Sequence, residues 1–157
     1  MGDKFPSMHK TRPCIIILLF LGMSWALFSC ATPSKKSSPK FEQYFIQGQQ
    51  LYLTHCSNCH QATGKGLGLL YPPLDSSDYM QQNIEDVLCL IRNGKEGELV
   101  VNGKSYNQKM PGNLILTDLE IAEIATYIYN AWDNKQGLLD VKFTSRILES
   151  CDSVTAH

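Results

Sequence analysis

Hydrophobic residues recur at three- and four-residue steps in two segments of the chain, which is the pattern of a helix with one buried face. The first repeat consists of Phe41, Tyr44, Phe45, Gly48, Tyr52 and His55. The second consists of Ile121, Ile124, Ala125, Ile128 and Trp132, and it follows the capping box Thr117-Asp118-Leu119-Glu120. Because glycine disfavours a helix, Gly48 predicts that the two helices cross closely there, with Ile124 and aromatic rings in contact.

Three further elements are predicted from shorter patterns. A helix is expected from residue 83 to residue 94, because Asn83 is a suitable N-cap, acidic residues fill the first turn and Gly94 suits the C-terminal end. Residues 97–106 are expected to form two short extended runs around Asn102-Gly103, a turn pair typical of hairpins. Residues 141–150 suit a short last helix, and most of the chain between residues 61 and 82 is expected to be loop.

Residues 1–29 have the pattern of an export signal. Lys4, Lys10 and Arg12 precede an apolar stretch of 14 residues, 15–28, which is short for a membrane span. The stretch Leu27-Phe28-Ser29-Cys30 resembles a bacterial lipobox, in which the signal peptide is cut before the cysteine and the cysteine is acylated. We favour this lipoprotein interpretation; cleavage after Ala31 and an uncleaved anchor are the alternatives.

All three alternatives place the mature chain outside the cytoplasm, on the periplasmic or extracytoplasmic side of a bacterial membrane. In the favoured interpretation, lipid on Cys30 anchors it to that membrane. Residues 30–40 are rich in Ser, Pro and Lys and are predicted to be a flexible tether. The folded domain is expected at residues 41–136, followed by a C-terminal tail at 137–157.

The charge pattern argues against nucleic-acid binding. From Cys30 onward the chain carries 11 Lys and Arg residues against 14 Asp and Glu residues, so the mature protein is mildly acidic. It has no basic cluster with interleaved aromatic residues, which is the pattern expected of a nucleic-acid-binding surface.

The residues Cys56-Ser57-Asn58-Cys59-His60 form a C-x-x-C-H motif, the attachment signature of c-type haem. Each thiol can add to one vinyl group of the porphyrin, and the histidine can bind the iron from the same turn. The motif therefore predicts one covalent haem c. A C-x-x-C pair alone also fits a thioredoxin-like site or half of a zinc site, but the sequence has neither a βαβ pattern nor a second ligand pair.

The remaining ligand candidates lie further along the chain. Met110 is the preferred second axial ligand, because a His/Met pair is a known haem ligand set, and Met80 is the alternative. The carbonyl of Pro72 or Pro73 is expected to accept a hydrogen bond from the second ring nitrogen of His60. Leu74 is expected to pack on the haem edge, and the candidates for bonding the haem propionates are Arg92 and Asn93, unless that helix end is simply solvated.

The chain contains six cysteines. Cys14 is removed with the leader, Cys30 would carry lipid, and two hold the haem. Cys89 and Cys151 remain. Because the compartment is oxidising and these two cysteines have no other role, we predict a disulfide between the C-terminal tail and the domain.

From about residue 41 to residue 134 the chain resembles a class I bacterial monohaem cytochrome c of the lipoprotein type. The residues that carry the resemblance are Gly48, Tyr52, the C-x-x-C-H motif, Tyr71-Pro72-Pro73-Leu74, Ser77-Asp78-Tyr79, Val101-Asn102-Gly103, Tyr106, Met110-Pro111, Tyr127-Ile128 and Trp132. The resemblance implies an all-α cytochrome c fold, with about three to five helices around one covalently bound haem c. It implies His60 and Met110 as axial ligands, and Pro73, Leu74 and Tyr106 as further haem contacts.

The resemblance also implies electron transfer and no enzymatic activity, so neither catalytic residues nor a small-molecule substrate are expected. The expected partners are redox proteins, between which a membrane-tethered cytochrome would shuttle single electrons. A haem subunit of a dehydrogenase, nitrite reductase or oxidase complex is one alternative. A peroxide- or gas-binding haem protein is the other, although no His or Arg suited to activating oxygen is evident in the sequence.

Overall fold

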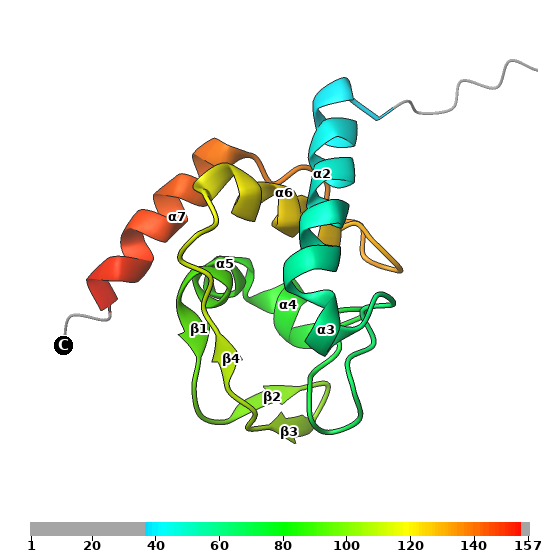
Figure 1. Ribbon diagram of the computed structural model, residues 1–157, viewed down its shortest axis with the longest axis vertical. Coiled ribbons are helices and arrows are strands. Elements are labelled where there is room, and N and C mark those ends of the chain that lie inside the picture. Colours follow the sequence, from blue (N-terminus) through cyan, green and yellow to red (C-terminus); the bar gives the residue numbers. More distant parts are fainter. Residues whose placement is uncertain (1–36, 155–157) are drawn as a thin grey trace, which may run out of the picture. The chain divides into compact units, whose positions relative to one another are not determined.

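The computed structural model describes residues 37–154 (Figure 1). The predicted export signal, the lipid-attachment residue Cys30 and most of the predicted tether lie outside the described residues. The described part contains six helices and four short strands: α2 (Pro39–His55), α3 (Ser57–His60), α4 (Asp78–Gln82), α5 (Ile84–Asn93), β1 (Gly94–Lys95), β2 (Leu99–Val101), β3 (Lys104–Tyr106), β4 (Met110–Pro111), α6 (Asp118–Ile128) and α7 (Val141–Val154). In residues 37–154 helices dominate and no strand exceeds three residues, which confirms the expected all-α class.

The N-terminal helix α2 begins at Pro39, two residues before the predicted start of the domain. Proline suits the first turn because its missing N–H has no partner in the helix there. The Ser38 hydroxyl accepts a hydrogen bond from the backbone N–H of Phe41 and so caps the helix. The buried residues of α2 are Tyr44, Gly48 and Tyr52, all of which belong to the predicted repeat.

Helices α2 and α6 form the largest interface between elements, and they cross in Figure 1 as the repeats predict. Both bonds of the predicted capping box are present: Thr117 accepts from the Glu120 backbone N–H, and the Glu120 carboxylate accepts from the Thr117 backbone N–H. A Cβ added to Gly48 would lie 1.9 Å from the carbonyl oxygen of Glu123 and 2.9 Å from Cβ of Tyr127. The close crossing is therefore confirmed, with Glu123 and Tyr127 at the contact in place of Ile124.

Aromatic rings fill the α2–α6 interface in a continuous series. The ring of Phe45 lies 5.2 Å from that of Tyr127, and Tyr127 lies 5.3 Å from Tyr52 and 5.7 Å from Trp132. These centroid separations, and the tilted or edge-on orientations of the rings, are favourable for aromatic pairs. The indole of Trp132 donates to the Ala62 carbonyl at 3.3 Å, which connects the cluster to the loop that follows α3.

Helix α5 has the predicted bounds, but the role of its first residue differs from the prediction. Asn83 occupies the N-cap position, yet its side chain makes no capping bond and donates instead to the Tyr79 carbonyl at 2.9 Å. The Asn83 amide thereby bonds a backbone carbonyl of the preceding helix α4. Strands β2 and β3 pair around Asn102 and Gly103, both with positive φ, so the predicted hairpin is confirmed.

A second antiparallel pair was not predicted. Strand β1, which continues directly from α5, pairs with β4, so that Gly94 lies opposite Pro111 and Lys95 opposite Met110. Two-residue strands have no alternating pattern by which a sequence could reveal them. This pair binds the segment that contains Met110 to the end of α5.

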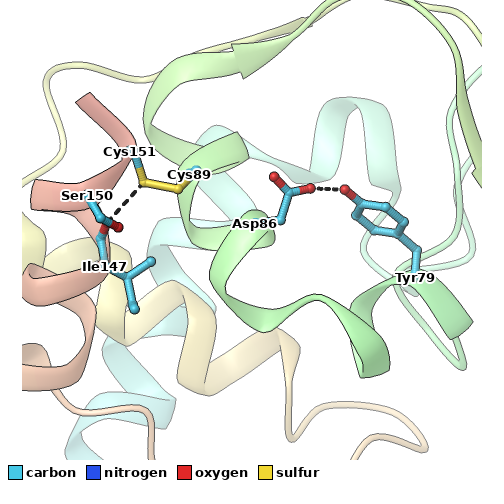
Figure 2. Close-up of a disulfide and its surroundings, with 6 residues drawn as sticks. All are labelled: Tyr79, Asp86, Cys89, Ile147, Ser150 and Cys151. Carbon is cyan, nitrogen blue, oxygen red and sulfur yellow. Dashed lines mark hydrogen bonds between the residues drawn. A yellow bond between two sulfur atoms is a disulfide. The ribbon is translucent and has the colours of Figure 1, made fainter. Parts of the chain in front are cut away.

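The predicted last helix is present as α7, which extends to Val154 and packs against α5 and α6. Asp140 caps it by accepting from the Phe143 backbone N–H at 3.0 Å. Cys151 on α7 and Cys89 on α5 form a disulfide with a Cα–Cα separation of 5.7 Å (Figure 2). None of the helices in residues 37–154 is both long and apolar enough to cross a membrane.

Candidate functional site

An apolar cavity, part of it open to solvent, lies within the described domain. Its walls come from five helices and from two of the strands, so distant segments of the sequence meet there. Six of the predicted site residues line it: Cys56, Cys59, His60, Pro73, Leu74 and Met110.

The C-x-x-C-H motif forms a single helical turn at the end of α2. The backbone N–H of Cys56 donates to the Tyr52 carbonyl at 2.9 Å, and the N–H groups of Cys59 and His60 both donate to the Cys56 carbonyl. In a helical turn, residues three and four apart lie on one face, so the two thiols and the imidazole face the same side. Both cysteines are free thiols, and burial, together with the nearby Cys59, raises the pKa of Cys56 to about 11.

His60 is held in the form that binds a metal. Its side chain is 9% exposed, and its Nδ1 lies 3.0 Å from the carbonyl oxygen of Pro72. A carbonyl can only accept, so Nδ1 carries the proton and Nε2 keeps a free lone pair. Burial lowers the pKa of the imidazole, opposed by the bond to Pro72, and the neutral ring is the ligand form. Of the two carbonyls expected to orient this histidine, that of Pro72 does so.

The loop after α3 places the Pro72 carbonyl beside His60. The N–H of Gly66 donates to the His60 carbonyl at 3.0 Å, and the N–H of Leu74 donates to the Gly64 carbonyl at 2.7 Å. A Cβ at Gly66, where φ is +65°, would lie 2.2 Å from the Tyr71 carbonyl oxygen. Glycine is therefore required there for the loop to fold back onto the prolines.

Both candidate methionines line the cavity. Met110 is half-buried on β4, and Met80 is 3% exposed on α4. The Met80 backbone carbonyl accepts a hydrogen bond from the Tyr129 hydroxyl at 2.8 Å, which connects α4 to the residue that follows α6. The structure thus brings a thioether from each candidate to the same cavity as His60, and the choice of Met110 remains a prediction.

Tyr106 lies in an adjoining space. It is buried on β3 and lines a second, smaller cavity, which shares Cys59, His60, Pro72 and Met110 with the first. The two spaces are parts of one site, so Tyr106 belongs to the same wall as the other predicted haem contacts.

Arg92, one of the two candidates for bonding the haem propionates, has a partner within the protein. The Arg92 guanidinium pairs with the Asp118 carboxylate, 26 residues further along the chain, and neither Arg92 nor Asn93 lines the cavity. The start of α6 lies close enough to the end of α5 to provide this partner. A guanidinium that is already paired with a carboxylate does not need a haem propionate as its counter-ion.

The face of α5 that lines the cavity was not predicted. Val87, Leu90 and Ile91 line it. Their three- and four-residue spacing is the signal that could have placed them on one face. His55 also lines the cavity, and its Nδ1 lies 3.4 Å from the Asn113 side-chain nitrogen.

The donor set fits a covalently bound haem. Two free thiols, a neutral imidazole with a free Nε2 and a thioether line one apolar cavity. Across residues 37–154, no three His, Cys, Asp or Glu side chains gather in a way that could hold a metal ion by themselves. The small strands are antiparallel pairs, so the described domain also lacks the βαβ unit of a thioredoxin-like site.

Comparison with known proteins agrees with this chemistry. The family model for cytochrome c matches residues 45–132. A cytochrome c-552 from Thermus thermophilus is 30% identical over 91 residues, which covers 54% of this chain and 67% of the relative. A second cytochrome c-552, from strain ATCC 27634 of Thermus thermophilus, is also 30% identical over 91 residues, but the alignment covers 60% of that relative. Helix α7, with Cys151, lies beyond the matched residues.

Proposed function

The chain belongs to the cytochrome c family, and we propose that it is a one-electron carrier in which Cys56, Cys59, His60 and Met110 hold a single haem c. The family implies a covalently bound haem c and redox protein partners, and its members are typically carriers rather than enzymes. The observation that carries the proposal is the His60 imidazole, whose Nδ1 is committed to Pro72 beside two free thiols.

Each residue has a separate task. Cys56 and Cys59 would hold the haem through thioether bonds, and His60 Nε2 and the Met110 sulfur would bind its iron. The Pro72 carbonyl fixes the orientation of the His60 ring and increases its basicity. When bound, the haem supplies a one-electron ferric/ferrous couple. The walls are mostly apolar, and a neutral sulfur ligand and an apolar site both favour the reduced form.

An apolar surface beside the motif supports exchange with protein partners. Leu67, Leu69 and Leu70 are 51%, 69% and 46% exposed. Their turn is closed by a bridge between Leu67 and Tyr71, and Tyr71 lines the site next to Cys59. Exposed leucines grouped in one turn are typical of contact sites. We infer that a redox partner docks here through a small apolar interface, which permits fast release.

The membrane-tethered form is part of the same proposal. It is supported by the leader at residues 1–29 and the lipobox-like sequence before Cys30. The residues between Cys30 and the start of α2 would be the tether on the extracytoplasmic side. Such a tether would keep the carrier near membrane-bound partners and raise its effective concentration.

The test is the spectrum of the purified protein, matured in a bacterium able to attach haem, in both oxidation states. We expect the mass of one covalent haem and, in the ferric state, a low-spin spectrum with the sulfur-to-iron charge-transfer band. Met110→Ala should abolish that band. Met80→Ala is the matched control, because its thioether lines the same cavity, and it should keep the band.

Three outcomes would contradict the proposal in different ways. A chain mass without haem would show that no haem is attached, and it would refute the proposed function. Loss of the band in Met80→Ala alone would identify Met80, in place of Met110, as the sulfur ligand. A five-coordinate, high-spin iron in the unsubstituted protein would favour the peroxide- or gas-binding alternative.

A further inference from the structure

We propose that the Cys89–Cys151 disulfide positions the axial methionine, by fixing the part of α5 to which the Met110 segment is bound. The inference rests on the proposed function, since it concerns the ligation of the haem by Met110. It assigns a role in the haem site to α7, an element that lies outside the family match at residues 45–132.

The disulfide joins α7 to α5 at a point near the end of α5. Figure 2 shows the bond between Cys151 on α7 and Cys89 on α5. Cys151 is 5% exposed, and α7 is further anchored by Leu148, which is 4% exposed in the core. Cys89 lies one helical turn before Asn93, the last residue of α5. The bond therefore fixes the final turn of α5 to a helix that is itself packed in the core.

That final turn binds the Met110 segment on both sides of the methionine. Strand β1 continues from α5 without a break, and Lys95 lies opposite Met110 in the β1–β4 pair. After the methionine, the Asn113 backbone N–H donates to the Ile91 carbonyl at 3.1 Å. Between these points a Cβ at Gly112 would lie 2.5 Å from the Asn93 carbonyl carbon, so the two backbones are in direct contact.

Few other interactions hold the methionine segment. Strand β4 is two residues long, and the ion pair between Lys109 and Glu96 joins side chains that are 65% and 73% exposed. An exposed pair of this kind contributes little. The next residues, Leu114 and Ile115, are 76% and 91% exposed, and the nearest contacts outside α5 are that of Asn113 with His55 at 3.4 Å and the buried Leu116. The position of α5 thus sets the position of the Met110 sulfur.

Packing between α5 and α7 is incomplete around the disulfide, which explains why a covalent bond is needed. An open groove runs beside it, lined by Ile84, Asn93, Phe143 and Ile147 together with both cysteines. Where side chains do not interdigitate, a helix can shift at small cost. Val87 and Ile91 of α5 face the haem cavity, and Leu90 lines both that cavity and the groove, so a shift of α5 also alters the cavity wall.

The experiment compares three holoproteins: the unsubstituted protein, the double variant Cys89→Ser with Cys151→Ser, and Leu148→Ala. The last is the matched control, because it weakens the packing of α7 but leaves the disulfide in place. The first readout is the affinity of the ferric iron for imidazole, which must displace the methionine to bind. The second is amide hydrogen exchange at residues 94–95 and 110–113, which does not depend on electron transfer.

We expect the double variant to bind imidazole at least tenfold more tightly, and its amides at 94–95 and 110–113 to exchange at least tenfold faster. Leu148→Ala should unfold at lower urea concentration with an unchanged imidazole affinity. If the double variant does not fold, the same measurements apply to folded protein in which the disulfide is reduced with dithiothreitol, alkylated with iodoacetamide, and the iron then reoxidised.

Two results would overturn the inference. The first is a double variant that is less stable but has unchanged imidazole affinity and amide exchange, since the bond would then only staple α7 to the domain. The second is an equal rise in imidazole affinity in Leu148→Ala, which would indicate general destabilisation. Failure of the proposed function is distinguishable, because it would appear as a missing sulfur-to-iron band in the unsubstituted protein.

Discussion

Gly48→Ala is the substitution whose effect follows most directly from the structure. The added Cβ would lie 1.9 Å from the Glu123 carbonyl oxygen and 2.5 Å from its carbonyl carbon, where ordinary contacts begin near 3.4 Å. The atoms in the way belong to the backbone of α6 and cannot rotate aside. Helices α2 and α6 would therefore have to separate by about 1.5 Å at the crossing.

Two effects of opposite sign determine how much Gly48→Ala changes the free energy of unfolding. Alanine in place of glycine within a helix stabilises it by about 1 kcal/mol. Overpacking costs about 1–3 kcal/mol when side chains can adjust, and more when backbone must move. The separation would also loosen the aromatic contacts between Tyr52, Tyr127 and Trp132. We expect a net loss of about 3 kcal/mol in the free energy of unfolding, since the backbone clash outweighs the gain in helix propensity.

The assay is urea unfolding of the holoprotein, followed by far-UV circular dichroism and by the haem absorbance. Gln47→Ala is the control, because Gln47 is exposed on the same helix and its truncation should change stability by less than about 0.5 kcal/mol. Because α2 leads directly into Cys56, the Gly48→Ala spectrum should also change before unfolding. A variant as stable as the unsubstituted protein would refute the close-crossing argument.

Two further predictions concern α6 and the docking surface. Hydrogen bonds from the backbone and the hydroxyl of Thr117 lower the pKa of Glu120. Its stabilising effect is therefore complete above the ordinary glutamate pKa of about 4.3 and is lost as pH falls through the lowered value. Glu120→Gln should reduce Tm at pH 7 and flatten the fall in Tm between pH 6 and pH 3, and equal slopes would contradict this. Replacing Leu69 and Leu70 by Ser should slow electron transfer to a gold electrode coated with a methyl-terminated alkanethiol by about tenfold, equivalent to about 1.4 kcal/mol. Leu119→Ser, exposed on α6, is the control for that measurement, and equal slowing by both variants would remove the docking assignment.

Features that depend on residues close together in the chain could be predicted from the sequence. The buried repeat of α2, the capping box at Thr117 and the hairpin at Asn102-Gly103 each involve neighbours within a few positions, and each is present. The C-x-x-C-H motif is of the same kind, because one helical turn is sufficient to bring Cys56, Cys59 and His60 together.

Features that depend on which distant segments meet were not predictable. Arg92 was expected at the haem propionates, but its partner is Asp118, and nothing near Arg92 in the sequence indicates this. The β1–β4 pair joins two-residue strands, which are too short to carry a hydrophobic pattern. The contact of Gly48 with the Glu123 backbone depends on the relative rotation of two helices, and periodicity gives only the face of each.

Whether a feature could be predicted depends on how far apart in the sequence its interacting residues lie. By itself, the sequence determined the helices, the attachment turn and the chemistry of the ligands, since capping, helical spacing and thiol reactivity are local properties. Only the tertiary structure decided that Pro72 orients His60, that both methionines reach one cavity, and that a helix beyond the family match is bonded to the wall of that cavity. Those arrangements depend on how apolar faces pack together, and packing is a property of the whole chain.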